Sequence, residues 1–315
     1  MTGPPAPPWP APRVAGWAVV AAVCLAVLGP TYARAFLPPA GGYTDFAQEW
    51  LTARDFLAGD PIYQDVPAAA RRHLPGRKPA DEGIGAIRVN AHPPVAVLVA
   101  LPFGLLGYPA AHLAWNLLTY ALFLVAAAVA VRELGIRLAW PAVFPAVVLL
   151  LGNPLLNQVY QGQFNCLLAA LLVAAWVADR RDRQVLAGVA VGLAAALKLF
   201  PLFLLVYFLA ARRWAGLMGA AAALLAANGL AAQFQDSWQN LSLAGFWSRL
   251  AGSDPVRTWA GAGATGQVLA KALSLVVVGL TAWVGWWAGA RDERDRAFAL
   301  AVVGMLLVSP LTWPH

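Results

Sequence analysis

The chain has 315 residues, of which 60% are hydrophobic and 12% charged, and its mean hydropathy is +0.64. A water-soluble domain of this length needs more polar surface, so the composition excludes that class and predicts a membrane protein. The net charge of +7 comes from Lys and Arg residues in short gaps between apolar runs, which favours a positive-inside bias over nucleic-acid binding.

The first 36 residues predict a cytoplasmic segment followed by a first transmembrane helix. Residues 1–13 are rich in proline and end in Arg13, and residues 14–36 are largely apolar. A basic residue ahead of such a run favours a cytoplasmic N-terminus. A removable signal peptide is the alternative, since Ala33-Arg34-Ala35 loosely resembles a cleavage site. We expect a retained helix, because the rest of the chain also contains repeated apolar segments.

Residues 37–92 form a long polar break, which predicts a loop outside the membrane. We expect a helix within it that begins near Thr44 and stops at Gly59-Asp60-Pro61, because these residue types favour helix starts and stops. Apolar side chains recur on one face of this helix at helical spacing: Phe46, Trp50, Ala53 and Leu57. The spacing predicts that this face lies along the membrane surface.

Two carboxylates of this helix, Asp45 and Glu49, stand four residues apart. They therefore share one face, with roughly 6 Å between their Cβ atoms. Such an arrangement can supply a general base. The alternative is a solvated helix face, with Asp45 favoured at the N-terminus by the helix dipole. Spacing alone leaves both interpretations open.

Residues 93–315 read as a bundle of apolar segments, each predicted to be helical from its run length. The predicted segments are 93–107, 110–131, 138–152, 165–178, 184–197, 201–211, 214–231, 265–290 and 296–308. Several are short or interrupted by proline, which is typical of broken helices that line a polar cavity. The predicted fold class is an all-α polytopic transmembrane bundle with a long first outer loop, and the abrupt end of the chain indicates truncation.

Basic gaps between the segments predict the orientation of the bundle. Arginine-rich gaps are expected in the cytoplasm: 132–137, 179–183, 212–213 and 291–296. The remaining breaks would then face outward: 37–92, 153–163, the residues around Lys198, 233–263 and 309–315. This arrangement requires one element that does not cross the membrane, most simply a re-entrant segment at 93–107.

The outward gaps contain further polar side chains of interest. His92 stands before two prolines that start a helix, and a capping or interfacial histidine is the alternative to a functional one. Gln161, Gln163 and Asn165 bring amides to the mouth of a helix. Amides suit hydroxyl-rich ligands such as sugars, because they both donate and accept hydrogen bonds. Hydrogen bonding between helices is the alternative.

Lys198 is an ammonium within an otherwise apolar run, close to the helix-breaking Pro201. A charge is costly in hydrocarbon, so this lysine predicts a functional site with an anionic partner, for which a phosphate is suited. Snorkelling to the interface is the alternative. Cys24 and Cys166 lie inside apolar runs and form no evident redox or metal motif.

Several short motifs follow one another along nearly the whole chain. They are Thr44-Asp45-Phe46, Gly59-Asp60-Pro61-Ile62-Tyr63, His92-Pro93-Pro94, Gly162-Gln163-Phe164-Asn165, Lys198 ahead of Phe200-Pro201, and Ser309-Pro310-Leu311-Thr312-Trp313-Pro314-His315. Each motif is weak alone. Their joint order resembles the family-87 glycosyltransferases, which are membrane mannosyltransferases of the C-type fold that use a polyprenyl phosphate sugar.

The resemblance implies an inverting transfer of a hexose, mannose in this family, from a polyprenyl monophosphate donor to a hydroxyl of a lipid or glycan acceptor. It places the reaction on the outer face of a bacterial cytoplasmic membrane and implies Asp45 as catalytic base. Cations or donors would hold the donor phosphate: Lys198, His92 and His315. Polar side chains would contact sugar or acceptor hydroxyls: Gln163, Asn165, Gln161, Tyr63 and Glu49.

Metal dependence is the point at which the sequence departs from the pattern of the C-type enzymes. Those enzymes often carry two acidic residues separated by one position, whereas Tyr43-Thr44-Asp45 offers a single Asp. The leaving group is already a phosphate, so no general acid is required. We therefore expect a reaction without metal or other cofactor. The expected partners are the donor, the acceptor and membrane lipids, and no nucleic acid.

Functions of other classes remain as alternatives. A secondary transporter would also have broken helices and an intramembrane lysine, but it usually shows paired half-repeats, and none is evident here. A flippase or assembly scaffold would not need Asp45. A glycan ligase or polymerase would more often use a large late outer loop with Arg and His, whereas residues 233–263 offer only Arg249 and Arg257 and no His.

Overall fold

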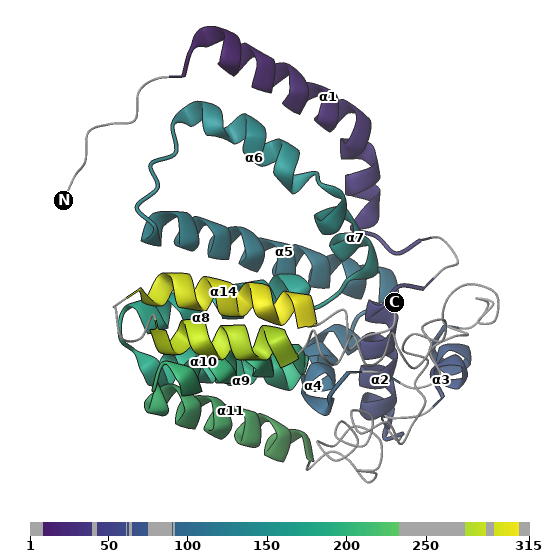
Figure 1. The fold of residues 1–315 in the computed structure, drawn as a ribbon. Helices are drawn as coiled ribbons and strands as arrows, with labels where there is room; N and C mark the ends of the chain where they lie inside the picture. Colours follow the sequence, from purple (N-terminus) through teal and green to yellow (C-terminus); the bar gives the residue numbers. More distant parts are fainter. Residues whose placement is uncertain are drawn as a thin grey trace, which may run out of the picture. The chain divides into compact units, whose positions relative to one another are not determined.

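The computed structural model describes residues 9–39, 43–60, 62, 65–74, 90, 92–232, 275–287 and 293–308 (Figure 1). All regular elements within these ranges are helices. The prediction of an all-α protein built from apolar helices is therefore confirmed.

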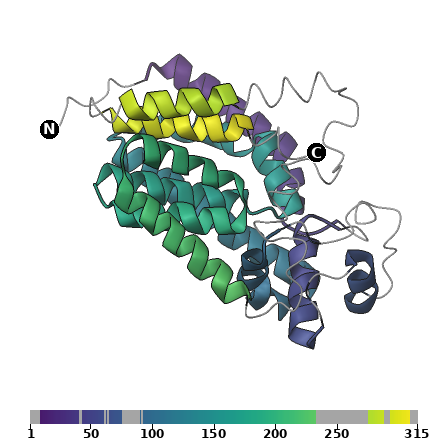
Figure 2. The same ribbon diagram turned by 60° about the horizontal axis from the view of Figure 1, so that its bottom comes forward.

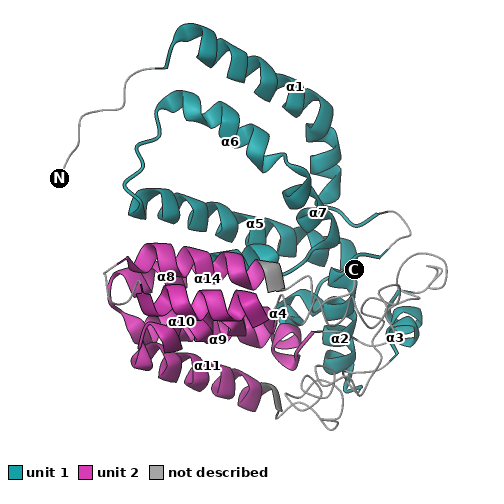
Figure 3. Ribbon diagram, viewed as in Figure 1, with its two compact units in different colours: residues 1–90, 99–170 teal, residues 91–98, 171–315 magenta. Residues whose placement is uncertain are grey.

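The chain divides into two compact units (Figure 3). Unit 1 comprises residues 1–90 and 99–170, and unit 2 comprises residues 91–98 and 171–315. One boundary follows residue 90, and the other two fall inside helices α4 (Pro94–Gly104) and α8 (Asn165–Arg180). Each unit buries an apolar cluster of its own.

Unit 1 contains the N-terminal helix and the helices of the predicted first loop. Its complete elements are α1 (Ala11–Ala35), α2 (Phe46–Ala58), α3 (Val66–His73), α5 (Tyr108–Glu133), η2 (Trp140–Ala142), α6 (Val143–Leu150) and α7 (Asn153–Gln161). Proline stands in the first turn of α5 and of α7, where its missing N–H costs no hydrogen bond. Helix α2 ends, as predicted, at Gly59, whose φ of 79° is left-handed.

Unit 2 is a bundle of mostly short helices. Its complete elements are α9 (Gln184–Leu197), η3 (Phe200–Phe203), α10 (Leu204–Ala210), α11 (Trp214–Ala232), the helix Leu275–Trp287 and α14 (Arg294–Val308). Figures 1 and 2 both show the helix Leu275–Trp287 alongside α14, and a side chain at Gly304 would press on Thr281. Helix α9 ends just before Lys198, as the nearby Pro201 predicts.

Two helices in the described part of the chain, α1 and α5, are long and apolar enough to cross a membrane. Residues 140–150 and α7 form a pair bent by 57°, which makes a third span if the pair is one broken helix. Several shorter apolar helices of 10–17 residues accompany them, including α4 and α9. The apolar helices make this chain a membrane protein.

The apolar face of α2 packs inside unit 1. The Phe46 ring stacks on the Trp115 ring with 5.4 Å between centroids, and Phe103 lies edge-on to Phe46 at 6.3 Å. Phe46, Trp50 and Ala53 are buried. The prediction that this face lies on the membrane surface is therefore wrong for these three residues, because the protein itself covers them, whereas Leu57 at the end of the stripe is exposed. A helix face that packs on protein and one that lies on lipid both require the same apolar spacing.

Helices α9 and α11 approach each other closely in unit 2. A side chain at Gly188 would overlap the carbonyl oxygen of Gly216, and a side chain at Gly219 would overlap the carbonyl oxygen of Val185. Small residues at such positions let two helix backbones pack directly, which is a common source of association between membrane helices.

Arginine-rich gaps of unit 2 meet in one network of ion pairs. Arg213 lies 3.0 Å from Asp179 and 2.6 Å from Asp182, and Arg294 lies 3.5 Å from Asp182. The hydrogen bond from Arg213 holds the pKa of the Asp182 carboxyl below its usual value, so the pair weakens only as the pH falls toward that lowered pKa. The gaps before α9, α11 and α14 therefore meet in this network, and their cytoplasmic location stays a prediction.

Candidate active site

Asp45 stands at the N-terminus of α2, on a backbone that α5 holds in place. The preceding residue, Thr44, donates its backbone N–H to the Tyr108 hydroxyl at 3.2 Å, and its own hydroxyl lies 2.9 Å from the same oxygen. Both Thr44 and Tyr108 are buried. The start of α2 is thus fixed to the first turn of α5 by two hydrogen bonds.

The turn between α7 and α8 packs against the start of α2. Gly162 ends α7 with a φ of 64°, and a Cβ atom there would lie 2.7 Å from the Phe46 Cβ. The Trp115 indole N–H donates to the Gly162 carbonyl oxygen at 2.7 Å. Only glycine combines this left-handed backbone with so close an approach. The turn therefore brings its amide side chains up to α2.

Two amides near this turn contact Asp45, and a third contacts one of them. Gln163 donates its side-chain N–H to Asp45 Oδ2 at 2.5 Å, and the Asp45 backbone N–H donates to Gln161 Oε1 at 3.2 Å. Asn165 donates its side-chain N–H to Gln163 Oε1 at 2.7 Å. The structure thus gathers Asp45, Gln161, Gln163 and Asn165, although residue 45 precedes the others by more than a hundred positions.

The second carboxylate of α2 has different surroundings from the first. Asp45 is half-buried, whereas Glu49 is only 1% exposed. A solvated helix face is therefore the wrong interpretation for Glu49. Asp45 is the carboxylate that retains access to solvent, and Asn165, at the far end of the amide chain, is exposed.

The residues predicted to hold the donor phosphate lie in unit 2 or outside the described residues. His92 is 9% exposed and precedes α4. Lys198 is half-buried and caps α9 with an extended backbone, φ −144° and ψ 137°. Their role at the phosphate stays a prediction. Tyr63 and His315 lie outside the described residues.

Polar side chains of α5 support the site and were not predicted. His112 is fully buried, with Nδ1 3.0 Å from the Phe36 carbonyl oxygen, and the Asn116 amide donates to the Val159 carbonyl oxygen at 2.8 Å. The signal that could have found them is their spacing. Tyr108, His112 and Asn116 follow one another at intervals of four residues in a largely apolar helix, and polar groups in such a segment indicate function or a specific contact.

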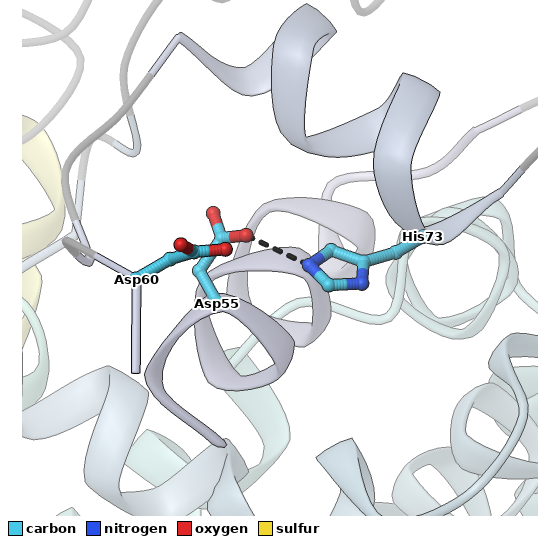
Figure 4. A group of neighbouring side chains, drawn as sticks. All are labelled: Asp55, Asp60 and His73. Carbon is cyan, nitrogen blue, oxygen red and sulfur yellow. Dashed lines mark hydrogen bonds and ion pairs between the residues drawn. The ribbon is translucent and has the colours of Figure 1, made fainter. Parts of the chain in front are cut away.

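A second polar cluster joins α2 to α3 (Figure 4). The Asp55 carboxylate is 2% exposed and lies 2.8 Å from Arg72 and 2.7 Å from His73 Nε2. Arg72 also lies 3.7 Å from Asp60. The hydrogen bond to Asp55 raises the pKa of the Arg72 guanidinium. These contacts fasten α3, a helix that was not predicted, to the C-terminal end of α2.

Ligand atoms of Asp55, Asp60 and His73 lie within 4.8 Å of one another, which is close enough to hold a metal ion. A metal would have to displace Arg72 and separate Asp55 from His73, because both side chains already contact the Asp55 carboxylate. A buried carboxylate that has a guanidinium partner already has its charge compensated. The cluster is therefore better suited to joining two helices than to binding a cation.

Comparisons with known proteins place the chain among membrane glycosyltransferases. The model of glycosyltransferase family 87 matches residues 90–310. A polyprenol-phosphate-mannose-dependent alpha-(1-2)-phosphatidylinositol mannoside mannosyltransferase of Mycobacterium tuberculosis is 28% identical, over 85% of this chain and 65% of the relative. The protein of the same name in Mycolicibacterium smegmatis is 29% identical, over 84% and 65%. A corresponding phosphatidylinositol pentamannoside mannosyltransferase of the latter organism is 28% identical, over 71% and 57%.

No solved structure matches this chain. The chain spans 65% of the length of the two phosphatidylinositol mannoside mannosyltransferases. The family match includes Gln161, Gln163 and Asn165, whereas Asp45 precedes the matched residues. Because the family model covers well over half of the sequence, the chain belongs to glycosyltransferase family 87.

Proposed function

We propose that the protein containing this chain transfers mannose, with inversion, from polyprenol phosphate mannose to a phosphatidylinositol mannoside. Membership of family 87 and the names of the relatives support the donor and the acceptor class. They favour a glycosyltransferase over a transporter, a flippase or a glycan polymerase. The observation that carries the chemistry is the half-buried Asp45 carboxylate, which an amide from a distant turn holds in place.

Asp45 is the general base of the proposed reaction. Its Oδ2 is bound by Gln163, and among the described residues its Oδ1 accepts no hydrogen bond. Oδ1 takes the proton of the acceptor hydroxyl while the hydroxyl oxygen attacks the anomeric carbon. The bond from that carbon to the phosphate oxygen breaks, and its electron pair leaves with the polyprenyl phosphate. Asp45 then returns its proton to water.

The donor phosphate requires positive charge or hydrogen-bond donors but no general acid, because a phosphate is already a stable leaving group. We assign this role to Lys198 and His92, with His315 as a further candidate. The same reasoning supports a reaction that needs no metal ion. We place the active site on the outer face in this proposal, because the positive-inside rule assigns the arginine-rich gaps between the apolar segments to the cytoplasm and leaves residues 37–92 outside.

Donor use by the purified full-length protein tests the proposed function. Radiolabelled polyprenol phosphate mannose and a phosphatidylinositol mannoside are supplied in detergent, with GDP-mannose as the comparison donor. We expect label to enter the acceptor lipid from the polyprenyl donor alone, both with and without EDTA. Transfer from GDP-mannose only, or no transfer from either donor, would contradict the proposed function. A loss of transfer in EDTA that Mg²⁺ restores would contradict the metal-free reaction.

A further inference from the structure

The Gln163 side chain has both ends of its amide occupied by other residues of unit 1. Its N–H lies 2.5 Å from Asp45 Oδ2, and its Oε1 lies 2.7 Å from the Asn165 amide nitrogen. We propose that Gln163 is a positioning residue for Asp45, and that Asn165 fixes its orientation. This inference rests on the proposed function, and it replaces the sugar-binding role that the sequence predicts for Gln163.

The direction of this hydrogen-bond chain follows from chemistry. An ionised carboxylate only accepts hydrogen bonds, so the Gln163 atom that faces Asp45 must be the nitrogen. The Gln163 oxygen then faces Asn165, whose nearest atom must in turn be a donor. If the Gln163 amide were rotated by half a turn, its oxygen would face the Asp45 carboxylate and its nitrogen would face the Asn165 nitrogen. The Asp45 carboxylate therefore selects the productive orientation of Gln163, and the hydrogen bond from Asn165 holds the amide in that orientation.

Hydrogen bonds also fix the backbone at Gln163. The Gln158 side-chain N–H donates to the Gln163 carbonyl oxygen, and the Gln163 backbone N–H donates to the Gln158 carbonyl oxygen at 3.3 Å. Gln158 is buried. The adjacent Gly162 carbonyl oxygen accepts the Trp115 N–H. A residue fixed in this way is suited to orienting a neighbour, because its own geometry is set by packing and hydrogen bonds.

As a consequence, Oδ2 of Asp45 is hydrogen-bonded to Gln163, and Oδ1 can accept a proton from the acceptor hydroxyl. Free rotation about the side-chain bonds would let either oxygen face the acceptor in several orientations. Gln163 restricts that rotation, so Oδ1 meets the acceptor hydroxyl in one geometry. A sugar-binding amide would act mainly on substrate affinity. A positioning amide acts on the rate of the chemical step.

Steady-state kinetics of the full-length protein test this role with radiolabelled polyprenol phosphate mannose as donor. Gln163→Leu removes the donor N–H, and we expect kcat to fall about 10- to 100-fold while the KM values for both substrates stay within about twofold. Gln163→Glu keeps the shape but turns an acceptor toward Asp45, so we expect a loss at least as large. Gln184→Leu, the same change on α9 outside the site, serves as the matched control and should keep wild-type kinetics.

Asn165→Ala tests the contribution of the hydrogen bond from Asn165 to Gln163. It should lower kcat less than Gln163→Leu does, and it should cause no further loss in the Gln163→Leu background, because both changes disable one chain of hydrogen bonds. If Gln163→Leu does not accumulate in membranes, Gln163→Glu and Asn165→Ala give the same comparison.

Three results would overturn the positioning role. They are a raised KM with unchanged kcat, additive losses in the double variant, and wild-type kcat in Gln163→Glu. Failure of the proposed function has a different signature, since the wild-type protein itself would then transfer no mannose. Full transfer by Asp45→Ala would overturn the base assignment and the positioning role together.

Discussion

At the scale of single residues, the surroundings of Asp45 and Glu49 decide which carboxylate can act as a base. Helical spacing places both on one face, and it could not separate them in the sequence. The structure does, because Glu49 is buried and Asp45 is half-buried under the Gln163 amide. Burial of this kind depends on contacts between residues far apart in the chain, which local spacing does not encode.

Gly162→Ala should destabilise the protein by about 1–3 kcal/mol, through overpacking and a left-handed backbone that alanine adopts poorly. The added Cβ would lie 2.7 Å from the Phe46 Cβ and 3.3 Å from His112 Nε2. Thermal unfolding of the purified protein in detergent measures the effect. Gly107→Ala is the control, since a Cβ there meets nothing within 4 Å. Equal stability of the two variants would show that the turn does not pack against α2 as described.

Lys198→Met should lower kcat/KM for the polyprenyl donor about 10- to 100-fold, as expected when a hydrogen bond to a charged group is lost. Lys198→Arg should retain more activity, because it keeps the positive charge. Both variants should accumulate in membranes as the wild type does. Unchanged kinetics in Lys198→Met would assign this lysine to snorkelling at the interface instead.

At the scale of helices, run length in the sequence predicted most of the elements. The segments predicted at 110–131 and 184–197 correspond to α5 and α9, for example, with ends within a few residues. Helix α7 was missed, because its amides made residues 153–163 read as a gap between spans. The local signals for it are Pro154 in its first turn and Gly162 after its last residue.

Gly188→Leu should disrupt unit 2, because no space for a side chain exists where α9 meets α11. We expect a lower thermal unfolding temperature or loss of the protein from membranes. Gly229→Leu makes the same change on α11 at a position where a Cβ meets nothing within 4 Å, and it should be tolerated. Similar behaviour of the two variants would contradict the close packing of α9 on α11.

At the scale of the whole molecule, the sequence predicted the residues of the candidate site, but it did not predict that they contact one another. Asp45, Gln161, Gln163 and Asn165 were each selected from local motifs. Their hydrogen bonds depend on the packing of α2 against α5 and the α7–α8 turn. Periodicity also could not say whether the apolar face of α2 meets lipid or protein, because both favour the same residues.

Orientation in the membrane can be tested with single cysteines in a chain that lacks Cys24 and Cys166. Tyr160→Cys lies in a gap expected outside, and Arg183→Cys lies in a gap expected in the cytoplasm, and both positions are exposed. A membrane-impermeant maleimide added to intact cells should label the first variant only. Lysis should make the second reactive as well. Labelling of Arg183→Cys in intact cells would reverse the proposed topology.

The most direct test of the proposed chemistry compares the two carboxylates of α2 in one mannose-transfer assay. Asp45→Asn removes the general base with little change in shape, so we expect transfer from polyprenol phosphate mannose to fall about 10²- to 10⁴-fold at wild-type expression. Glu49→Gln alters a buried side chain that takes no proton in the proposed reaction, and its loss should be much smaller. Wild-type transfer by Asp45→Asn would contradict the assignment of Asp45 as the base.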